Sequence, residues 1–358
     1  MFQRILVPLD GSALAEQALP VAARLVRASG GTIILLQVAV VPIVERPDLT
    51  PAQEYGQQAV DEGFLSTMEY LEQVASKDEL ADITIERRAL FGAIAPTILS
   101  TAQSSQADLI VMSSHGYTGL KRWSLGSVAQ KVARHSPVPV LVLREGASLP
   151  ILAQGSSSVL SVLVPLDGSK LAEAAIEPAA QLIAALAASS QGKLHLLRVV
   201  AIPSTRGKFR SQSHIDFDVE VRAQAKQEAE AYMQALLSRL PASVLSAPNV
   251  AVSTGVVVSE DVAQAIIQAA EHDTQAKEVA ASSEQSVIAM ATHGRGGIGR
   301  WALGSKTERV LGACKVPLMI VRPQHVKDKH ALNHGEATQG EAVEVEEMIV
   351  VEETWIEP

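Results

Sequence analysis

Two segments of this chain occur twice with nearly the same sequence, and this repeat constrains the fold more than any other feature. Residues 6–12 read LVPLDGS and return unchanged at residues 163–169, an offset of 157 residues. A second pair of segments, residues 115–144 and 293–322, is offset by 178 residues. This period is too long for a solenoid repeat, so each copy is predicted to be a domain.

Domain boundaries follow from the composition. Residues 1–145 are the first predicted domain and residues 159–322 the second, and we call them the first and second repeats. Residues 146–158 contain glycine, proline and a serine run, which is typical of a linker. Residues 323–358 are a predicted acidic tail with nine acidic and two basic residues. Its alternation of valine or isoleucine with glutamate favours an arm that pairs with a partner chain, and a solvated tail is the alternative.

Strands and helices alternate along both repeats. In the first repeat, short apolar runs predict strands over residues 3–9, 32–40, 83–89, 108–112 and 138–143. The segments between them predict helices over residues 12–28, 50–76, 93–102 and 127–134. The second repeat has the same order, including a helix over residues 171–188. This pattern predicts an α/β fold of two tandem, doubly wound, five-stranded parallel sheets, each covered by helices on both faces.

The composition excludes several classes of protein. The net charge is -9 and lies mostly in the tail, so the rest of the chain lacks the basic surface that grips nucleic acid. Only 3% of the residues are aromatic, too few for stacking on single strands. The longest apolar runs have about ten residues, whereas a membrane span needs roughly 20, and no secretory signal is visible. Cys314 is the single cysteine, which excludes an intrachain disulfide and a multi-cysteine metal site, and we expect it to be buried.

Candidate binding residues gather where the strands are predicted to end. Open sheets of this kind bind ligands beyond the carboxyl ends of their strands, at the point where the strand order reverses. Asp10 and Asp167 follow the first strand of each repeat. If the first and fourth strands are neighbours, these aspartates face the loops that follow the fourth strands.

The two fourth-strand loops have the same glycine spacing. In the first repeat, nine residues separate Gly116 from a Gly-Ser pair at 126–127, and the second repeat has the same spacing from Gly294 to 304–305. Glycine lets backbone N–H groups approach an anion, and a helix N-terminus adds unpaired N–H groups and a partial positive charge. The serine of each pair is expected to bind a phosphate oxygen or to cap the helix. Together these features predict a phosphate site in each repeat.

These motifs resemble those of the universal stress protein family, in its tandem two-domain (UspA-like) form, over nearly all of residues 1–322. The family's nucleotide motif is Gly, two residues, Gly, nine residues, then Gly-Ser or Gly-Thr, and Ser113 and Ala291 stand here at its first glycine. The resemblance implies an adenine nucleotide alpha hydrolase-like fold with the repeats packed as an internal pseudo-dimer. The last strands, residues 138–143 and 316–321, would then pair antiparallel and protect their edges.

The resemblance also implies which residues bind the nucleotide. An aspartate after the first strand contacts the nucleoside, and the end of the second strand makes apolar contact with adenine. In the first repeat the expected site comprises Pro8, Leu9, Asp10, Val38, Met112, Ser113, Gly116, Gly126, Ser127 and Val128. In the second repeat it comprises Pro165, Leu166, Asp167, Val199, Met290, Ala291, Gly294, Gly304, Ser305 and Lys306.

The implied function is binding of ATP, ADP or AMP, with Mg²⁺ beside the phosphates, in a cytoplasmic stress-response sensor or adaptor. Expected partners are the adenine nucleotide and an unidentified client protein, and a homodimer of the whole chain stays open. Two alternatives remain, a slow ATP hydrolase or phosphoryl-transfer enzyme and a structural adaptor that binds no nucleotide. The sequence has no Walker A, HExxH, CxxC or nucleophile-elbow motif, so no catalytic residue or metal ligand is assigned. His115 and His293 are expected to belong to the loop scaffold.

Overall fold

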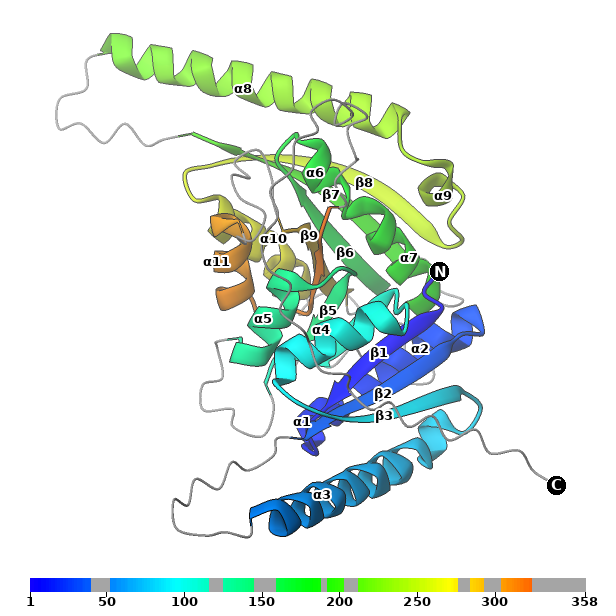
Figure 1. Ribbon diagram of the computed structural model, residues 1–358. Coiled ribbons are helices and arrows are strands. Elements are labelled where there is room, and N and C mark those ends of the chain that lie inside the picture. Colours follow the sequence, from blue (N-terminus) through cyan, green and yellow to red (C-terminus); the bar gives the residue numbers. More distant parts are fainter. Residues whose placement is uncertain are drawn as a thin grey trace, which may run out of the picture. The chain divides into compact units, whose positions relative to one another are not determined.

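Strands and helices alternate along the chain as predicted, and residues 1–323 form one compact unit (Figure 1). The computed structural model describes residues 1–39, 52–115, 125–144, 159–187, 192–202, 212–275, 284–292 and 304–323. The elements of the first repeat are β1 (Arg4–Leu9), α1 (Ala13–Glu16), α2 (Ala18–Ser29), β2 (Thr32–Ala39), α3 (Ala52–Ala75), the short 3₁₀ helix η1 (Asp78–Leu80), β3 (Thr84–Phe91), α4 (Ile94–Ser104), β4 (Leu109–Ser113), α5 (Ser127–His135) and β5 (Val140–Leu143). Those of the second repeat are β6 (Val159–Leu166), α6 (Lys170–Glu173), α7 (Ile176–Leu186), β7 (Gly192–Ala201), α8 (Gln212–Ser238), α9 (Ala242–Leu245), β8 (Val250–Ser259), α10 (Val262–Gln275), β9 (Glu284–Ala291), α11 (Ser305–Ala313) and β10 (Leu318–Val321). The predicted linker and nearly all of the predicted tail lie outside the described residues.

Both repeats contribute to one continuous sheet, whose strands lie in the order β3-β2-β1-β4-β5-β10-β9-β6-β7-β8. Within each repeat the strands are parallel, which confirms the predicted α/β fold. The first strand of each repeat lies between the second and the fourth, so the strand order reverses beside β1 and beside β6. These are the positions at which doubly wound sheets bind their ligands.

The two halves of the sheet meet at their last strands. β5 pairs antiparallel with β10, and Leu141 stands opposite Met319, with both side chains fully buried. Arg144, also buried, donates a hydrogen bond from the first repeat to the Leu311 carbonyl of the second. Cys314 lies beside it and is buried as predicted, and burial raises the pKa of its thiol to about 11 despite the opposing charge of Arg144. The predicted antiparallel pairing of the last strands is confirmed.

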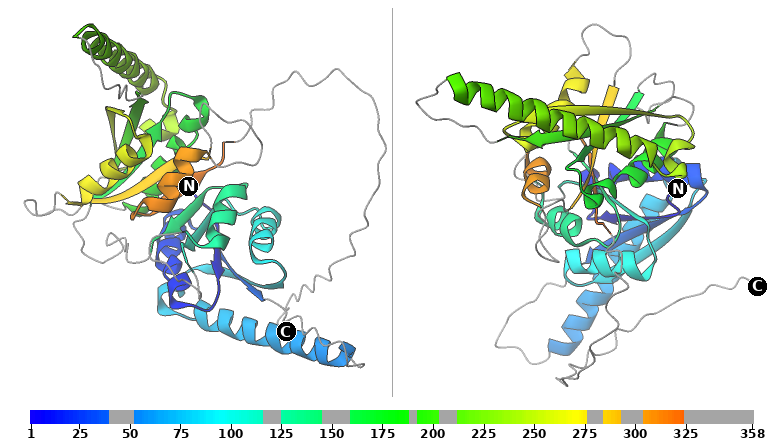
Figure 2. Two further views of the ribbon diagram at one scale, coloured as in Figure 1. Left: turned by 90° about the vertical axis from the view of Figure 1, so that its left-hand side faces the viewer. Right: turned by 90° about the horizontal axis from the view of Figure 1, so that it is seen from above.

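Helices cover both faces of the sheet. On one face a single apolar cluster extends across both repeats and includes Leu25 of α2 and Ile183 of α7. On the opposite face there are two clusters, one with Ile98 of α4 in the first repeat and one around Ile267 of α10 in the second, which also includes Ala133 of α5. The long helices α3 and α8 pack against the outermost strands, β3 and β8 (Figure 2). The shared cluster and the shared sheet therefore join the two repeats by apolar burial as well as by backbone pairing.

The helix that follows the first strand is broken in both repeats, which corrects the predicted continuous helices over residues 12–28 and 171–188. α1 is separate from α2, and α6 is separate from α7. The cause is Pro20 in the first repeat and Pro178 in the second, because proline has no N–H to donate to the carbonyl four residues earlier. A separate helix of four residues therefore follows each Asp-Gly-Ser segment in the chain.

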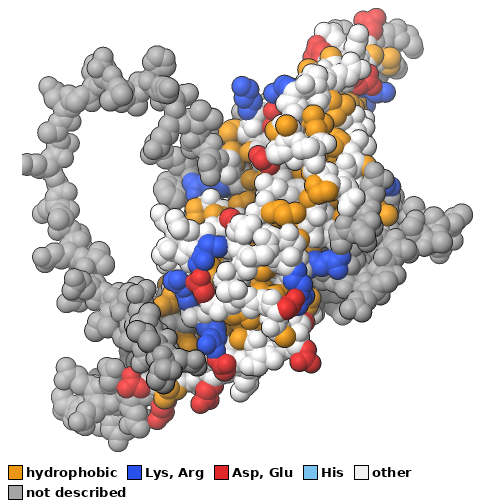
Figure 3. Space-filling model, turned by 90° about the vertical axis from the view of Figure 1, so that its right-hand side faces the viewer, with side chains coloured by type: hydrophobic (Ala, Val, Ile, Leu, Met, Phe, Trp, Pro, Cys, Tyr) orange, Lys and Arg blue, Asp and Glu red, His pale blue; other side chains and the backbone are white. Residues whose placement is uncertain are grey.

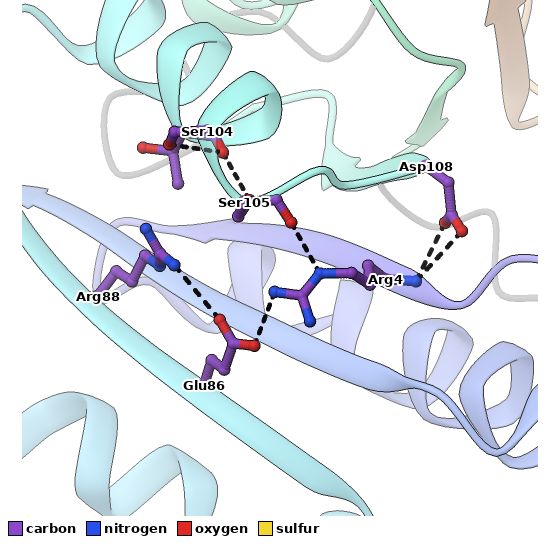
Figure 4. Close-up of polar contacts among 7 residues, drawn as sticks. Arg4, Glu86, Arg88, Ser104, Ser105 and Asp108 are labelled. Atoms are coloured by element: carbon purple, nitrogen blue, oxygen red, sulfur yellow. Dashed lines mark hydrogen bonds and ion pairs between the residues drawn. The ribbon is translucent and has the colours of Figure 1, made fainter. Parts of the chain in front are cut away.

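A polar cluster closes the amino ends of the first-repeat strands (Figure 4). Arg4 contacts Glu86 Oε1 at 2.7 Å through Nη2 and donates from Nε to the Ser105 carbonyl at 2.7 Å. Asp108 accepts from the Arg4 backbone N–H at 3.2 Å. Burial raises the pKa of Asp108, and hydrogen bonds from the Gln3 and Arg4 backbone partly oppose that rise. These contacts tie β1 to β3 and to the start of β4, at the end of the strands opposite to the candidate site.

Basic and acidic side chains are interspersed over the surface shown in Figure 3, without a continuous basic area on that face. That distribution agrees with a charge that is concentrated in the tail. Within the described ranges, no helix combines the length and the apolarity needed to cross a bilayer.

Candidate functional site

The strand register brings the predicted site residues to one edge of the sheet in each repeat. Leu6 of β1 pairs with Ile110 of β4. Four residues further on, Asp10 and Ser114 therefore lie level with one another beyond the carboxyl ends of these strands. In the second repeat β6 and β9 have the same register, since Leu163 pairs with Ile288.

The Asp-Gly-Ser segment of the first repeat forms a hydrogen-bonded turn. Asp10 Oδ1 accepts hydrogen bonds from the Ser12 N–H at 3.0 Å and from the Ser12 hydroxyl at 2.6 Å. The Ser12 hydroxyl in turn accepts from the Ala15 N–H at 3.2 Å, which confirms the predicted cap of the following helix. Gly11 has a φ of +82°, in the left-handed region that favours glycine. Asp10 therefore organises the turn, directly after the carboxyl end of β1.

The second repeat builds the same turn with nearly the same distances. Asp167 Oδ1 accepts from the Ser169 N–H at 2.9 Å and from its hydroxyl at 2.6 Å. The Ser169 hydroxyl accepts from the Ala172 N–H at 3.2 Å, and Gly168 has a φ of +83°. Both repeats thus present a carboxylate at the same place, already oriented by its own turn.

The loop after the fourth strand is closed by its second glycine. The Gly126 N–H donates to the Ser114 carbonyl at 2.8 Å, and the Ser114 N–H donates to the Leu143 carbonyl at 2.8 Å. In the second repeat the Gly304 N–H donates to the Thr292 carbonyl at 2.8 Å. Each loop therefore returns to the end of its own strand, and the N-terminus of α5 or α11 is held beside the carboxyl end of β4 or β9.

Gly126 and Gly304 are the N-caps of these helices, and neither N-cap has a side-chain hydrogen bond. Ser127 and Ser305 are the first helical residues, and both are exposed. The predicted opening of a helix by each Gly-Ser pair is confirmed, but the serines are not the capping residues. Their hydroxyls, together with the N–H groups of the first turn that have no partner within the helix, form a surface suited to an anion.

There is less space for a side chain at Gly126 than at Gly304. A Cβ atom on Gly126 would lie 2.8 Å from the Ser114 carbonyl oxygen, closer than real Cβ contacts allow. A Cβ atom on Gly304 would lie 3.2 Å from the Thr292 carbonyl oxygen. The backbone at both positions approaches the strand end so closely that glycine fits best, and the first repeat tolerates a side chain least.

Ser113 occupies the position of the first glycine in the family motif, and its hydroxyl makes a hydrogen bond within the loop. The Ser113 hydroxyl donates to the His115 carbonyl at 2.6 Å, and Ser114 Oγ lies 3.1 Å from His115 Nδ1. His115 Nε2 is buried and has no hydrogen-bond partner among the described residues. In the second repeat Ala291 is buried, and its carbonyl accepts from the Thr307 hydroxyl at 3.1 Å.

The other predicted residues divide into core and edge positions. Side chains that pack into the apolar clusters offer only backbone groups to a ligand, and these are Leu9, Met112, Leu166, Val199 and Met290. Partly buried or exposed positions are Pro8, Val38, Val128 and Lys306, whereas Pro165 is buried. Gly116, Gly294 and His293 lie outside the described residues. Among the described residues, no group of three or more histidine, cysteine, aspartate or glutamate side chains could hold a metal ion.

A cluster that the sequence did not predict recurs beside both Asp-Gly-Ser turns. In the first repeat, Glu16 accepts from the Tyr70 hydroxyl at 3.0 Å and pairs with Lys77 Nζ at 2.5 Å. The equivalent glutamate of the second repeat accepts from the Tyr232 hydroxyl at 2.8 Å and from Arg239 at 2.6 Å. These contacts fasten the short helix behind each turn to α3 or α8. The sequence does contain one signal for this cluster. Tyr70 and Tyr232 are 162 residues apart, and so are Lys77 and Arg239.

Both tyrosines have raised pKa values. Burial raises the pKa of Tyr70 above its ordinary value of 10.0, and the hydrogen bond to Glu16 raises it further. Tyr232 is shifted in the same direction, first by burial and then by Glu173. The folded protein therefore keeps these phenolic protons at a pH where the unfolded chain releases them. Their contribution to stability is full below pH 10.0 and is lost as the pH rises above that value.

The double substitution Tyr70→Phe and Tyr232→Phe is expected to make the alkaline loss of stability shallower. Urea unfolding at about pH 9 and about pH 11 measures the slope. The variant begins less stable near neutral pH because the hydroxyl bonds to both glutamates are gone. A slope equal to that of the unmodified protein would contradict the assigned titration.

Comparison with known proteins agrees with this architecture. The model of the Universal stress protein family matches residues 1–144 and 160–322. The chain is 31% identical over 150 residues to the universal stress protein YxiE of Bacillus subtilis, covering 40% of this chain and 100% of that protein. It is 25% identical over 326 residues to a universal stress protein of Mycolicibacterium smegmatis, covering 89% of this chain and 97% of the relative. The crystal structure of a universal stress protein from Archaeoglobus fulgidus shares the fold, with a TM-score of 0.56, 21% identity and coverage of 89% of this chain and 98% of the other.

Proposed function

Because this chain belongs to the universal stress protein family, we propose that it binds ATP or ADP at the carboxyl ends of the strands in each repeat. Binding would make it a nucleotide-dependent sensor or adaptor in the cytoplasmic stress response, with the two repeats acting as an internal pseudo-dimer. A ligand that prefers one conformation shifts the population towards it, which is how occupancy would reach a client protein.

One observation carries this proposal. In both repeats a Gly-Ser helix start is hydrogen-bonded to the end of the fourth strand, level with an oriented aspartate that follows the first strand. The helix N-terminus suits phosphate, and the aspartate suits the hydroxyl groups of a ribose. Both chemistries stand at the point of strand-order reversal, as a nucleotide requires.

Magnesium would be held in this site mainly by the nucleotide. Mg²⁺ commonly keeps several water ligands and binds substrate phosphates with one or two carboxylates. Asp10 and Asp167 are the carboxylates that belong to the proposed sites. Among the described residues no larger ligand set is present, and no base for hydrolysis is assigned.

The proposal is tested by asking what the purified protein carries and what it binds. The protein is heat-denatured, and the released small molecules are separated by chromatography. The protein stripped of nucleotide by unfolding and refolding is then titrated with ATP and Mg²⁺ in a calorimeter. We expect adenine nucleotide in the extract, or saturable ATP binding in the micromolar range. No nucleotide in the extract and no binding at millimolar ATP would overturn the proposal and leave the nucleotide-free adaptor.

A second measurement on the same complex separates binding from catalysis. Incubation of the complex followed by chromatography shows whether ATP is converted to a defined product. Recovery of unchanged ATP supports a sensor or adaptor. A product formed in proportion to the protein concentration would favour the hydrolase or phosphoryl-transfer alternative.

A further inference from the structure

One ion pair joins the two repeats in a single direction. Arg134, in the last turn of α5, contacts Glu308 Oε1 of α11 at 2.9 Å through Nη2. The pair connects the two helices that begin at the proposed phosphate sites (Figure 1). The repeats are offset by 178 residues in this region, so the reverse pair would join Gly312 to Gln130, and neither of these carries a charge. The first repeat therefore supplies a cation to the second, and receives none in return at this position.

Glu308 lies in the first turn of α11, the helix whose N-terminus is proposed to bind the phosphates of the second site. Its backbone N–H donates to the Gly304 carbonyl at 2.9 Å, so it is one helical turn, about 6 Å along the axis, from that N-cap. Helical side chains lean towards the N-terminus, so an unrestrained carboxylate at this position can approach the first turn. The first turn of α5 has no acidic residue, and Gln130 stands at the equivalent position. The two helix starts therefore differ by one negative charge.

A carboxylate in the first turn of a helix opposes the binding of an anion at the same end. The partial positive charge and the N–H groups of a helix N-terminus attract acidic side chains as well as phosphates. The charge also repels phosphates that lie within the screening distance of about 8 Å at physiological salt. A cation in contact with Glu308 offsets both effects, because it neutralises the carboxylate and holds it in one place.

Arg134 is placed to be that cation. Its side chain is 32% exposed, against 48% for Glu308, so packing limits where the guanidinium can lie. Its Nε is buried without a hydrogen-bond partner among the described residues, and within those residues Glu308 is the acidic side chain that it contacts. The structure thus pairs a positioned cation of the first repeat with the competing carboxylate of the second.

Resting on the proposed nucleotide binding, we propose that Arg134 of the first repeat raises the nucleotide affinity of the second site. It acts through Glu308, as a positioning residue that does not itself contact the ligand. When the ion pair is formed, the carboxylate is kept from the N-terminus of α11 and the phosphates bind there. When the pair is broken, the carboxylate competes with them. The first site has no such dependence on the second repeat, because Gln130 and Gly312 form no ion pair.

The test measures the ATP affinity of the second site alone, by calorimetry in a Gly126→Asp background. Arg134→Gln is expected to weaken binding about fivefold, and Arg134→Lys to restore most of the loss. Glu308→Gln should bind at least as tightly as the background, and the double variant should bind like Glu308→Gln alone. A merely structural tie between α5 and α11 predicts instead that both single variants weaken binding alike.

Two further measurements separate charge from folding. Raising the salt concentration from about 0.05 M to about 1 M should shrink the effect of Arg134→Gln, because salt screens the uncompensated carboxylate. The same variants are also titrated without Gly126→Asp, where the change should appear in one site of the two. Urea unfolding shows whether each variant is folded under the conditions of the titration.

The matched control is Arg27→Gln, which removes a cation that pairs with Asp82 near the amino ends of the strands. It should leave the second site unchanged. The first site, measured in a Gly304→Asp background, is expected to keep its ATP affinity in Arg134→Gln. No loss in Arg134→Gln, or an equal loss in Glu308→Gln, would overturn this inference while the proposed function stands. Absence of ATP binding to the unmodified protein would overturn both.

Discussion

Replacing Gly126 with Asp is expected to abolish ATP binding at the first site while the second site still binds. The added side chain would meet the Ser114 carbonyl, whose oxygen is 2.8 Å from the position of a new Cβ. Its carboxylate would also stand at the helix N-terminus proposed to hold the phosphates. Steric crowding and like-charge repulsion together predict an affinity loss of about 100-fold or more. Calorimetric titration should then show one site for each chain instead of two.

Gly304→Asp is expected to do the same at the second site, and the double variant to bind no nucleotide. The control is Gly312→Asp, which adds the same charge to α11 at a position where a Cβ meets nothing within 4 Å. It should bind ATP like the unmodified protein. Unchanged affinity and stoichiometry in both site variants would place the phosphates elsewhere.

Replacing Met319 with Ala is expected to lower the free energy of unfolding by about 2–5 kcal/mol. Its side chain is fully buried opposite Leu141, where β10 of the second repeat pairs with β5 of the first. Truncation leaves a cavity in the apolar cluster that both repeats share. The loss therefore affects the first repeat as well as the second, and urea unfolding should still show a single transition shifted to lower urea concentration.

Leu65→Ala is the control for this prediction, because Leu65 lies on α3 with 60% of its surface exposed. Its expected effect is within about 0.5 kcal/mol. Two separate transitions in the Met319→Ala variant, with the first repeat unfolding at its original urea concentration, would show that the two repeats do not form one cooperative unit.

The sequence predicted the features that depend on local patterns. Apolar runs ended by Asp-Gly-Ser became strands and capped turns, since both follow from residues close together in the chain. The Gly-Ser pairs opened helices for the same reason. The repeat and the family resemblance together predicted the antiparallel joining of the last strands, which no local pattern shows.

Features that depend on distant residues were missed. The cluster of Glu16, Tyr70 and Lys77 joins positions 54 and 61 residues apart, and no spacing rule marks such a contact. The ion pair of Arg134 with Glu308 joins the two repeats across 174 positions. The break in the first helix follows from Pro20, because its missing N–H outweighs the continuous apolar pattern of the segment.

The joining of β5 to β10 also affects how the protein responds to dilution. Two separate subunits that met through these strands would come apart at low concentration, and identical subunits would have to carry identical sites. Here both strands belong to one polypeptide, so their encounter is intramolecular and does not depend on the amount of protein present. Each half is always matched with its one unlike neighbour, in a fixed one-to-one ratio. A duplicated chain can therefore let one half diverge, as position 308 has, without losing the other.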